Sequence, residues 1–135
     1  ADVWSVTSFT ELRREGLASE RQARLHPEAD APQPWVAECL AGSDVPVVAA
    51  TDYMKALPDG IRAWVPGHFE VLGTDGFGRS DFRRHLRRFF EVDRHHVAVA
   101  ALRSLAADGR IEPSVVAGAI AKYELDPDAP DPSIS

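Results

Sequence analysis

A glycine-rich turn, placed between a predicted strand and a predicted helix, is the segment whose residues could most directly bind an anion. Gly73, Gly76 and Gly78 punctuate it, and Arg79 follows at once. Free backbone N–H groups at the start of a helix, together with an arginine, can hold a phosphate. The glycine order, however, is neither GxGxxG nor GxxxxGK[ST]. We therefore favour the interpretation in which the glycines allow positive φ and close packing in a tight turn.

Two aspartates are the best candidates for polar side chains of a site. Asp52 and Asp75 each follow a predicted strand within a Thr-Asp pair, and α/β sheets place their sites at the carboxyl ends of strands. Both could equally be helix caps. The sequence contains no serine elbow, no CxxC pair and no paired carboxylates with apolar neighbours. The residues alone therefore identify no catalytic group.

An arginine-rich segment could form a nucleic-acid patch together with His95 and His96. Its arginines are Arg79, Arg83, Arg84, Arg87, Arg88 and Arg94. Acidic residues interrupt the segment, the formal net charge of the chain is -6, and arginines opposite an apolar stripe are typical of a solvated or interface-forming helix. We favour the latter interpretation. No metal is expected at the two histidines, because adjacent residues on a helix point about 100° apart and the i,i+4 ligand spacing is absent.

Length and composition indicate one ordinary globular domain. The chain has 135 residues, of which 44% are hydrophobic and 27% are charged, so one sizeable core is expected. No apolar run reaches the roughly 18 residues of a membrane-spanning helix. The single Cys39 excludes an intrachain disulfide and favours a reducing compartment; it is expected to be a small buried hydrophobe.

Three strands are predicted from apolar and β-branched runs, at residues 3–7, 45–50 and 69–73. Capping boxes beginning at Ser8 and Ser19 predict a pair of helices interrupted at Gly16. Further helices are predicted to begin at Pro34, at Ala56, near Ser80, after Asp93 and at Pro113. Strands alternating with helices predict an α/β fold with a mostly parallel sheet covered by helices on both faces. We expect one α/β domain over residues 1–125 and an extended, acidic, proline-rich tail over residues 126–135.

Four segments together resemble the C-terminal domain of the homodimeric, thiamine-diphosphate-dependent pyruvate dehydrogenase component. They are ADVWSVTSFTELRREG, VPVVAATDYMKALPDGIRAWVP, FEVLGTDGFGRSDFRRHLRRFFEVD and VVAGAIAKYELD. The resemblance implies a fold of the transketolase C-terminal type, whose first strand and helix would precede Ala1, so that the chain is expected to be a fragment of a longer one. It also implies a cytoplasmic enzyme that decarboxylates pyruvate and reductively acetylates the lipoyl group of the acyltransferase component.

The resemblance assigns no catalytic, cofactor-binding or metal-binding residue to this sequence. The family binds thiamine diphosphate and Mg²⁺ through other domains, and its GDG signature and catalytic histidines are absent here. The segment alone is therefore expected to be inactive, with a role in forming the homodimer and in shaping access to the active site. The candidate entrance or interface residues are Asp52, Asp75, Gly76, Phe77, Gly78, Arg79, Arg84 and Arg87. The alternative is a free-standing α/β module whose arginine-rich helix, residues 80–90, contacts an acidic or nucleic-acid partner.

Overall fold

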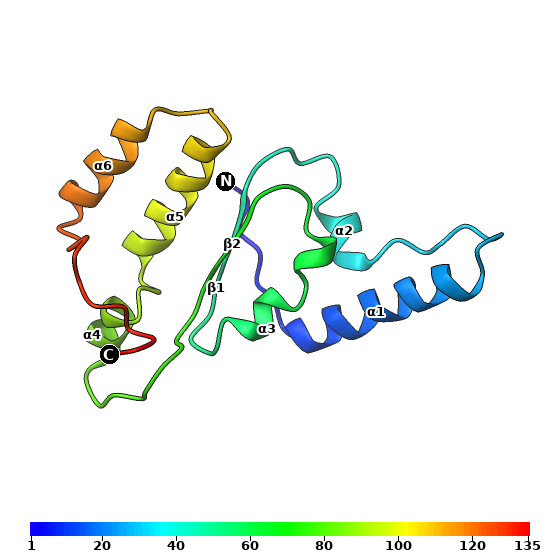
Figure 1. Ribbon diagram of the computed structural model, residues 1–135, viewed down its shortest axis with the longest axis horizontal. Coiled ribbons are helices and arrows are strands. Elements are labelled where there is room, and N and C mark those ends of the chain that lie inside the picture. The colour runs from blue at the N-terminus through cyan, green and yellow to red at the C-terminus, as the bar shows by residue number, and fades with distance from the viewer. The chain divides into compact units, whose positions relative to one another are not determined.

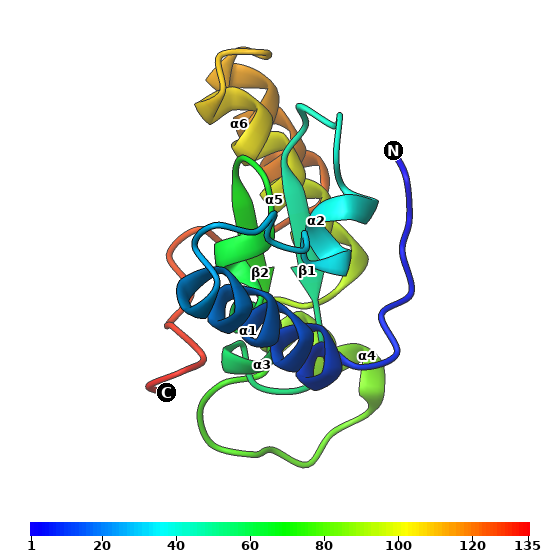
Figure 2. The ribbon, with the colours of Figure 1, turned by 90° about the vertical axis from the view of Figure 1, so that its right-hand side faces the viewer.

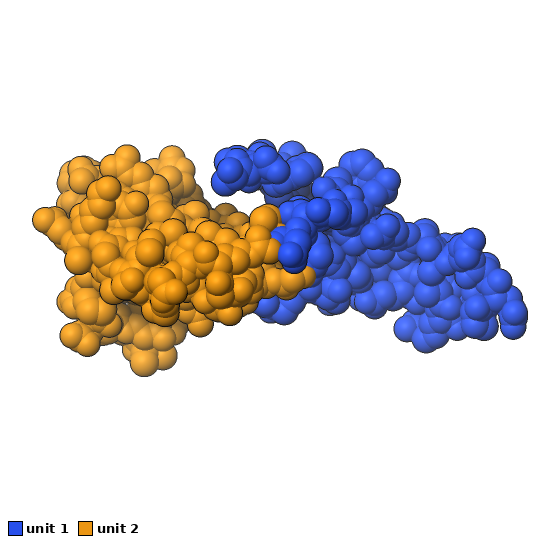
Figure 3. Space-filling view, turned by 90° about the horizontal axis from the view of Figure 1, so that it is seen from above, with its two compact units in different colours: residues 1–44, 56–66 blue, residues 45–55, 67–135 orange.

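Two parallel strands, β1 (Val47–Ala50) and β2 (Phe69–Leu72), form the sheet of this protein in a computed structural model that describes residues 1–135 (Figures 1 and 2). The chain divides into two units, shown in separate colours in Figure 3. Unit 1 comprises residues 1–44 and 56–66, and unit 2 comprises residues 45–55 and 67–135. No helix is both long enough and apolar enough to cross a membrane.

The sheet lies in unit 2, and its register pairs Val47 with Phe69 and Ala50 with Leu72. Helix α5 (Arg94–Ala107) packs against both strands, and Phe69 and Ala100 are buried. The predicted parallel α/β arrangement is thus confirmed. The sheet has two strands rather than the predicted three. Each strand is also shorter than its apolar run, because the regular ladder covers only the four residues of each strand that pair with the other.

The predicted strand at residues 3–7 is wrong. This segment has no regular secondary structure, and Val3 is 96% exposed. A segment rich in β-branched and aromatic residues forms a strand only where its backbone N–H and C=O groups can pair with a neighbouring strand. Unit 1, to which these residues belong, contains no strand.

In unit 1, the predicted helix pair is one continuous helix, α1 (Phe9–Leu25). The first capping position is correct, because the Ser8 hydroxyl accepts a hydrogen bond from the Glu11 amide. The second is wrong: Ser19 is buried inside the helix, and its hydroxyl donates to the carbonyl of Glu15. Gly16 does not interrupt the helix, because the ring of Trp64 packs directly on it.

Three short helical segments complete unit 1. Helix α2 (Trp35–Cys39) follows Pro34, as predicted, and Gly42 lies in the left-handed region at φ 74°. The predicted single helix from Ala56 is divided into α3 (Ala56–Asp59) and the 3₁₀ helix η1 (Arg62–Trp64). The division follows Pro58 and Gly60, and the Ile61 amide donates to the carbonyl of Pro58, three residues back, instead of four.

Unit 2 also contains α4 (Arg83–Phe89) and α6 (Pro113–Lys122), the latter alongside α5 (Figures 1 and 2). Two predicted helix starts are confirmed. Asp93 caps α5 by accepting from the amides of His95 and His96, and Pro113 is the first residue of α6. The C-terminal residues 126–135 form short turns, and Pro132 and Ser133 lie directly against Gly76.

Candidate functional site: an arginine-lined pocket beyond the strand ends

The loops that follow β1 and β2 meet at the same edge of the sheet, as the sequence predicts for parallel strands. The Thr51 amide donates to the Leu72 carbonyl at 3.0 Å, and the Thr74 amide donates to the Tyr53 carbonyl at 2.9 Å. The Thr74 hydroxyl also donates to the carbonyl of Asp52 at 3.0 Å. These bonds continue the strand pairing into the loops and fix the positions of both Thr-Asp pairs.

The two candidate aspartates have different roles. Asp75 binds the backbone of the loop after β1, because its Oδ1 accepts from the Lys55 amide at 3.1 Å. Asp52 instead pairs with arginines of α4: Arg87 donates from Nε at 3.1 Å and from Nη2 at 2.7 Å, and Arg83 donates from Nη2 at 3.4 Å. Arg83 and Arg87 are four residues apart and therefore lie on one face of the helix.

The Arg87 hydrogen bond holds the pKa of Asp52 below its ordinary value, and burial opposes this shift only in part. The same hydrogen bond raises the pKa of Arg87. The side chains of Asp52 and Arg87 are 53% and 42% exposed, so solvent screens the pair and its contribution to stability is small. The pair orients α4 against the strand ends more than it stabilises the fold.

A pocket of about 320 Å³ opens between these loops and α4. Its lining combines three arginines, one carboxylate, one threonine, two glycines and three apolar side chains. The lining residues are Asp52, Thr74, Gly76, Gly78, Arg79, Arg83, Leu86, Arg87, Phe90 and Val92. Phe90 and Val92 are buried, and the guanidinium carbon of Arg79 lies 4.0 Å from the centre of the Phe89 ring, a cation–π contact.

The structure brings five of the eight candidate residues to this pocket: Asp52, Gly76, Gly78, Arg79 and Arg87. The other three are Asp75, Phe77 and Arg84. Phe77 is 78% exposed, and Arg84 is exposed without a hydrogen bond or an ion pair. The conformational interpretation of the glycines is confirmed at Gly76, where φ is 101° and an added Cβ would lie 2.5 Å from the Pro132 carbonyl oxygen.

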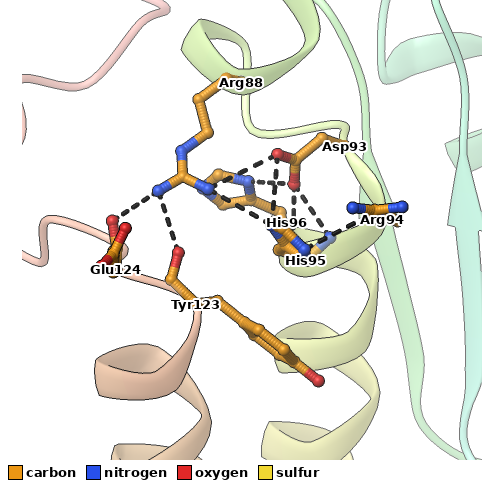
Figure 4. A network of polar contacts seen from close by, with 7 residues as sticks. All are labelled: Arg88, Asp93, Arg94, His95, His96, Tyr123 and Glu124. Carbon is orange, nitrogen blue, oxygen red and sulfur yellow. Dashed lines mark hydrogen bonds and ion pairs between the residues drawn. The ribbon is translucent and has the colours of Figure 1, made fainter. Parts of the chain in front are cut away.

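A second polar cluster, which sequence reasoning missed, joins the ends of α4, α5 and α6 (Figure 4). Arg88 donates to the carbonyl of Tyr123 at 3.2 Å and to that of Glu124, so it caps the C-terminal end of α6. Its Nη1 also lies 3.7 Å from Asp93 Oδ2. The only sequence signal for this cluster was Asp93 as a helix cap, because nothing local indicates which carbonyls Arg88 reaches.

The adjacent histidines complete this cluster. His96 Nδ1 lies 2.8 Å from Asp93 Oδ1, and the His95 ring stacks on Tyr123 with centroids 4.7 Å apart (Figure 4). Burial raises the pKa of Asp93, but the amide and ring of His96 and the amide of His95 together outweigh it, and the net shift is downward. Each histidine thus has a partner within unit 2: His96 pairs with Asp93, and His95 stacks on Tyr123 at the end of α6.

The donor set of this chain does not suit the Mg²⁺ that accompanies thiamine diphosphate. No group of three or more His, Cys, Asp and Glu side chains that could hold a metal ion occurs within residues 1–135. The carboxylates nearest the pocket already have partners, Arg87 for Asp52 and Lys55 for Asp75. We derive no chemical step through this cofactor in these residues.

Comparison with known proteins identifies the family. The model of the transketolase-like TK C-terminal domain matches residues 1–93. The chain is 62% identical over 133 residues to the pyruvate dehydrogenase E1 component of Pseudomonas aeruginosa, covering 98% of the chain and 15% of that protein. It is 50% identical over 136 residues to the E1 component of Escherichia coli K12, covering 100% and 15%, and 48% identical over 126 residues to that of Mycobacterium tuberculosis, covering 93% and 14%.

The chain therefore spans about 15% of the length of the curated relatives that it matches. The match of the family model extends from the first residue through both strands and α4 to Asp93, the cap of α5. It includes the loops of the arginine-lined pocket. The resemblance seen in the sequence is confirmed, and the chain belongs to the family of transketolase-like TK C-terminal domains.

Proposed function

We propose that this chain is the C-terminal part of an E1 component of a pyruvate dehydrogenase complex, a thiamine-diphosphate-dependent enzyme that decarboxylates pyruvate and reductively acetylates lipoyl groups. One observation carries the proposal: the 62% identity to such a component over 98% of the chain. In this proposal thiamine diphosphate and Mg²⁺ bind to other domains. The partners are a second E1 subunit and the lipoyl-bearing acyltransferase component, and the enzyme is cytoplasmic.

Within that enzyme, this domain contributes to the dimer contact and to the approach to the active site rather than to the reaction. Exposed aromatic and arginine side chains support an interface role, because both types are enriched at protein interfaces. Phe77 and Phe82 are 78% and 79% exposed. Arg84 lies close to them in the chain and has no partner within it.

The proposed activity is tested with the natural full-length protein that carries this sequence. We expect it to reduce ferricyanide in the presence of pyruvate, and to require both thiamine diphosphate and Mg²⁺. Residues 1–135 alone should show no such activity. A full-length protein that is folded and cofactor-loaded but does not turn over pyruvate would refute the assignment.

The interface role is tested separately by reversing one charge. Arg84→Glu is preferred to a change at Arg87, because Arg87 is bonded to Asp52 and its loss would disturb the fold of the site. We expect Arg84→Glu to shift the sedimentation of the full-length enzyme toward the monomer. Arg94→Glu, an equal charge change at another exposed arginine of unit 2, is the control. Identical sedimentation of both variants and the wild type would contradict the interface role.

A further inference from the structure

The pocket beyond the strand ends carries an excess of positive charge. Three arginines line it, Arg79, Arg83 and Arg87, against one carboxylate, Asp52, which leaves a formal charge of +2. The neighbouring carboxylates, Asp75 and Asp81, are not part of the lining and do not offset this charge. Asp75 accepts from the Lys55 amide, and Asp81 accepts from the amide that follows it in the chain.

Two of the three arginines have donors available for a ligand. Arg87 uses Nε and Nη2 on Asp52, whereas Arg83 makes one long contact of 3.4 Å to the same carboxylate. Arg79 makes no hydrogen bond to a carboxylate, and its guanidinium is held over the ring of Phe89. A planar guanidinium held by stacking keeps its N–H groups in a fixed fork, which suits a phosphate.

Three of the remaining lining residues are apolar, and the others are Thr74, Gly76 and Gly78. The apolar residues are Leu86, Phe90 and Val92, and the last two are buried in unit 2. The pocket volume of about 320 Å³ lies at the lower end of the range for small-molecule sites, which combine apolar surface with a few convergent polar groups. A phosphate ion alone would leave this apolar surface uncovered, whereas a phosphate ester with a small apolar group would cover it.

We propose that this pocket binds a small organic phosphate, with its phosphoryl group on Arg79 and Arg83 and its apolar group against Leu86, Phe90 and Val92. A phosphate monoester carries close to two negative charges at neutral pH and therefore matches the charge of the pocket. Asp52 acts as an internal competing anion that holds Arg87 and limits the affinity. The proposal goes beyond the proposed pyruvate chemistry and does not depend on it.

The test measures amide hydrogen exchange in the natural full-length protein with and without phenyl phosphate. Exchange is read in peptides covering residues 74–92, so that binding elsewhere in the protein does not contribute. We expect phenyl phosphate to slow exchange there. The double variant Arg79→Gln, Arg83→Gln should need at least about tenfold more phenyl phosphate for the same protection. Arg94→Gln, which removes an exposed arginine outside the pocket, should behave as the wild type.

Two further arms make the proposal specific. Asp52→Asn should bind phenyl phosphate several-fold more tightly than the wild type, because it removes the competing charge; this change is opposite in sign to that of the arginine variants. Inorganic phosphate should protect less than phenyl phosphate at the same concentration. The proposal is overturned if wild-type protection is absent, if the double variant is protected as well as the wild type, or if inorganic phosphate is equally effective.

Discussion

Replacing Gly16 with alanine tests how unit 1 is held together. Gly16 lies in the middle of α1, where a Cβ atom would lie 2.5 Å from Cε3 and Cζ3 and 2.6 Å from Cδ2 of Trp64. Carbon atoms in contact are normally about 3.5–4.0 Å apart. The indole must therefore retreat by about 1 Å, and its Nε1, which donates to Glu20 Oε1 at 3.0 Å, moves with it.

The expected magnitude is a balance of three effects. Alanine is favoured over glycine in a helix by about 1 kcal/mol. Overpacking costs about 1–3 kcal/mol, and weakening the Trp64–Glu20 hydrogen bond costs about 1 kcal/mol. The net result is a loss of about 1–3 kcal/mol for Gly16→Ala. Gly118, also inside a helix, has no atom within 4 Å of an added Cβ, so Gly118→Ala should stabilise α6 by up to about 1 kcal/mol.

Native-state amide hydrogen exchange of the natural full-length protein measures both effects, because it gives opening free energies for α1 and α6 separately. We expect faster exchange in α1 of Gly16→Ala and slower exchange in α6 of Gly118→Ala. In a Trp64→Leu background, the cost of Gly16→Ala should fall, since the ring that it meets is gone. If Gly16→Ala protects α1 as Gly118→Ala protects α6, the close approach of Trp64 is refuted.

Three further predictions concern unit 2. Because hydrogen bonding to Arg87 lowers the pKa of Asp52, ionised Asp52 stabilises the fold at neutral pH, and this contribution is lost as the pH falls below the ordinary value of 3.8 and through the lower pKa of the folded state. The difference in unfolding free energy between wild type and Asp52→Asn, followed by denaturant titration, should therefore be constant near neutrality and shrink below about pH 4. Gly76→Ala, at φ 101° and 2.5 Å from the Pro132 carbonyl oxygen, should release the C-terminal turns and speed limited proteolysis there, whereas Gly78→Ala, with no atom within 4 Å, should not. Arg88→Met removes the donors on the last carbonyls of α6 and should speed amide exchange in that helix but not in α1, with Arg84→Met, at an exposed arginine without a partner, as the control.

The elements that sequence predicts correctly are those with local signals. Asp93 and Pro113 mark the starts of α5 and α6 through groups within three residues of the helix end. The apolar runs of β1 and β2 and the chain connectivity between them are enough to predict a parallel pair, and with it the common edge where Asp52 lies.

The elements that were wrong depend on residues distant in the chain. Gly16 continues α1 because Trp64 fills the space beside it, and no pattern near Gly16 indicates that ring. The sequence around Arg87 indicates only an exposed basic helix face. Its partner, Asp52, lies 35 positions away in the chain and is found only from the structure. The same holds for Arg88, whose partners are backbone carbonyls 35 and 36 positions away and therefore have no side-chain signature at all.

The partners of the α4 arginines also bear on the alternative of a nucleic-acid module. Of the six arginines of the arginine-rich segment, Arg87 is held by Asp52 and Arg88 by the carbonyls of Tyr123 and Glu124, which leaves Arg79, Arg83, Arg84 and Arg94 for an external anion. Four phosphate contacts would give a salt-dependence slope of only about −3 to −4, and the formal net charge of -6 opposes a polyanion. A small anion avoids that opposition because it contacts only the local excess of charge. The geometry therefore favours a confined phosphate pocket and a short protein contact over a surface that follows a nucleic-acid backbone.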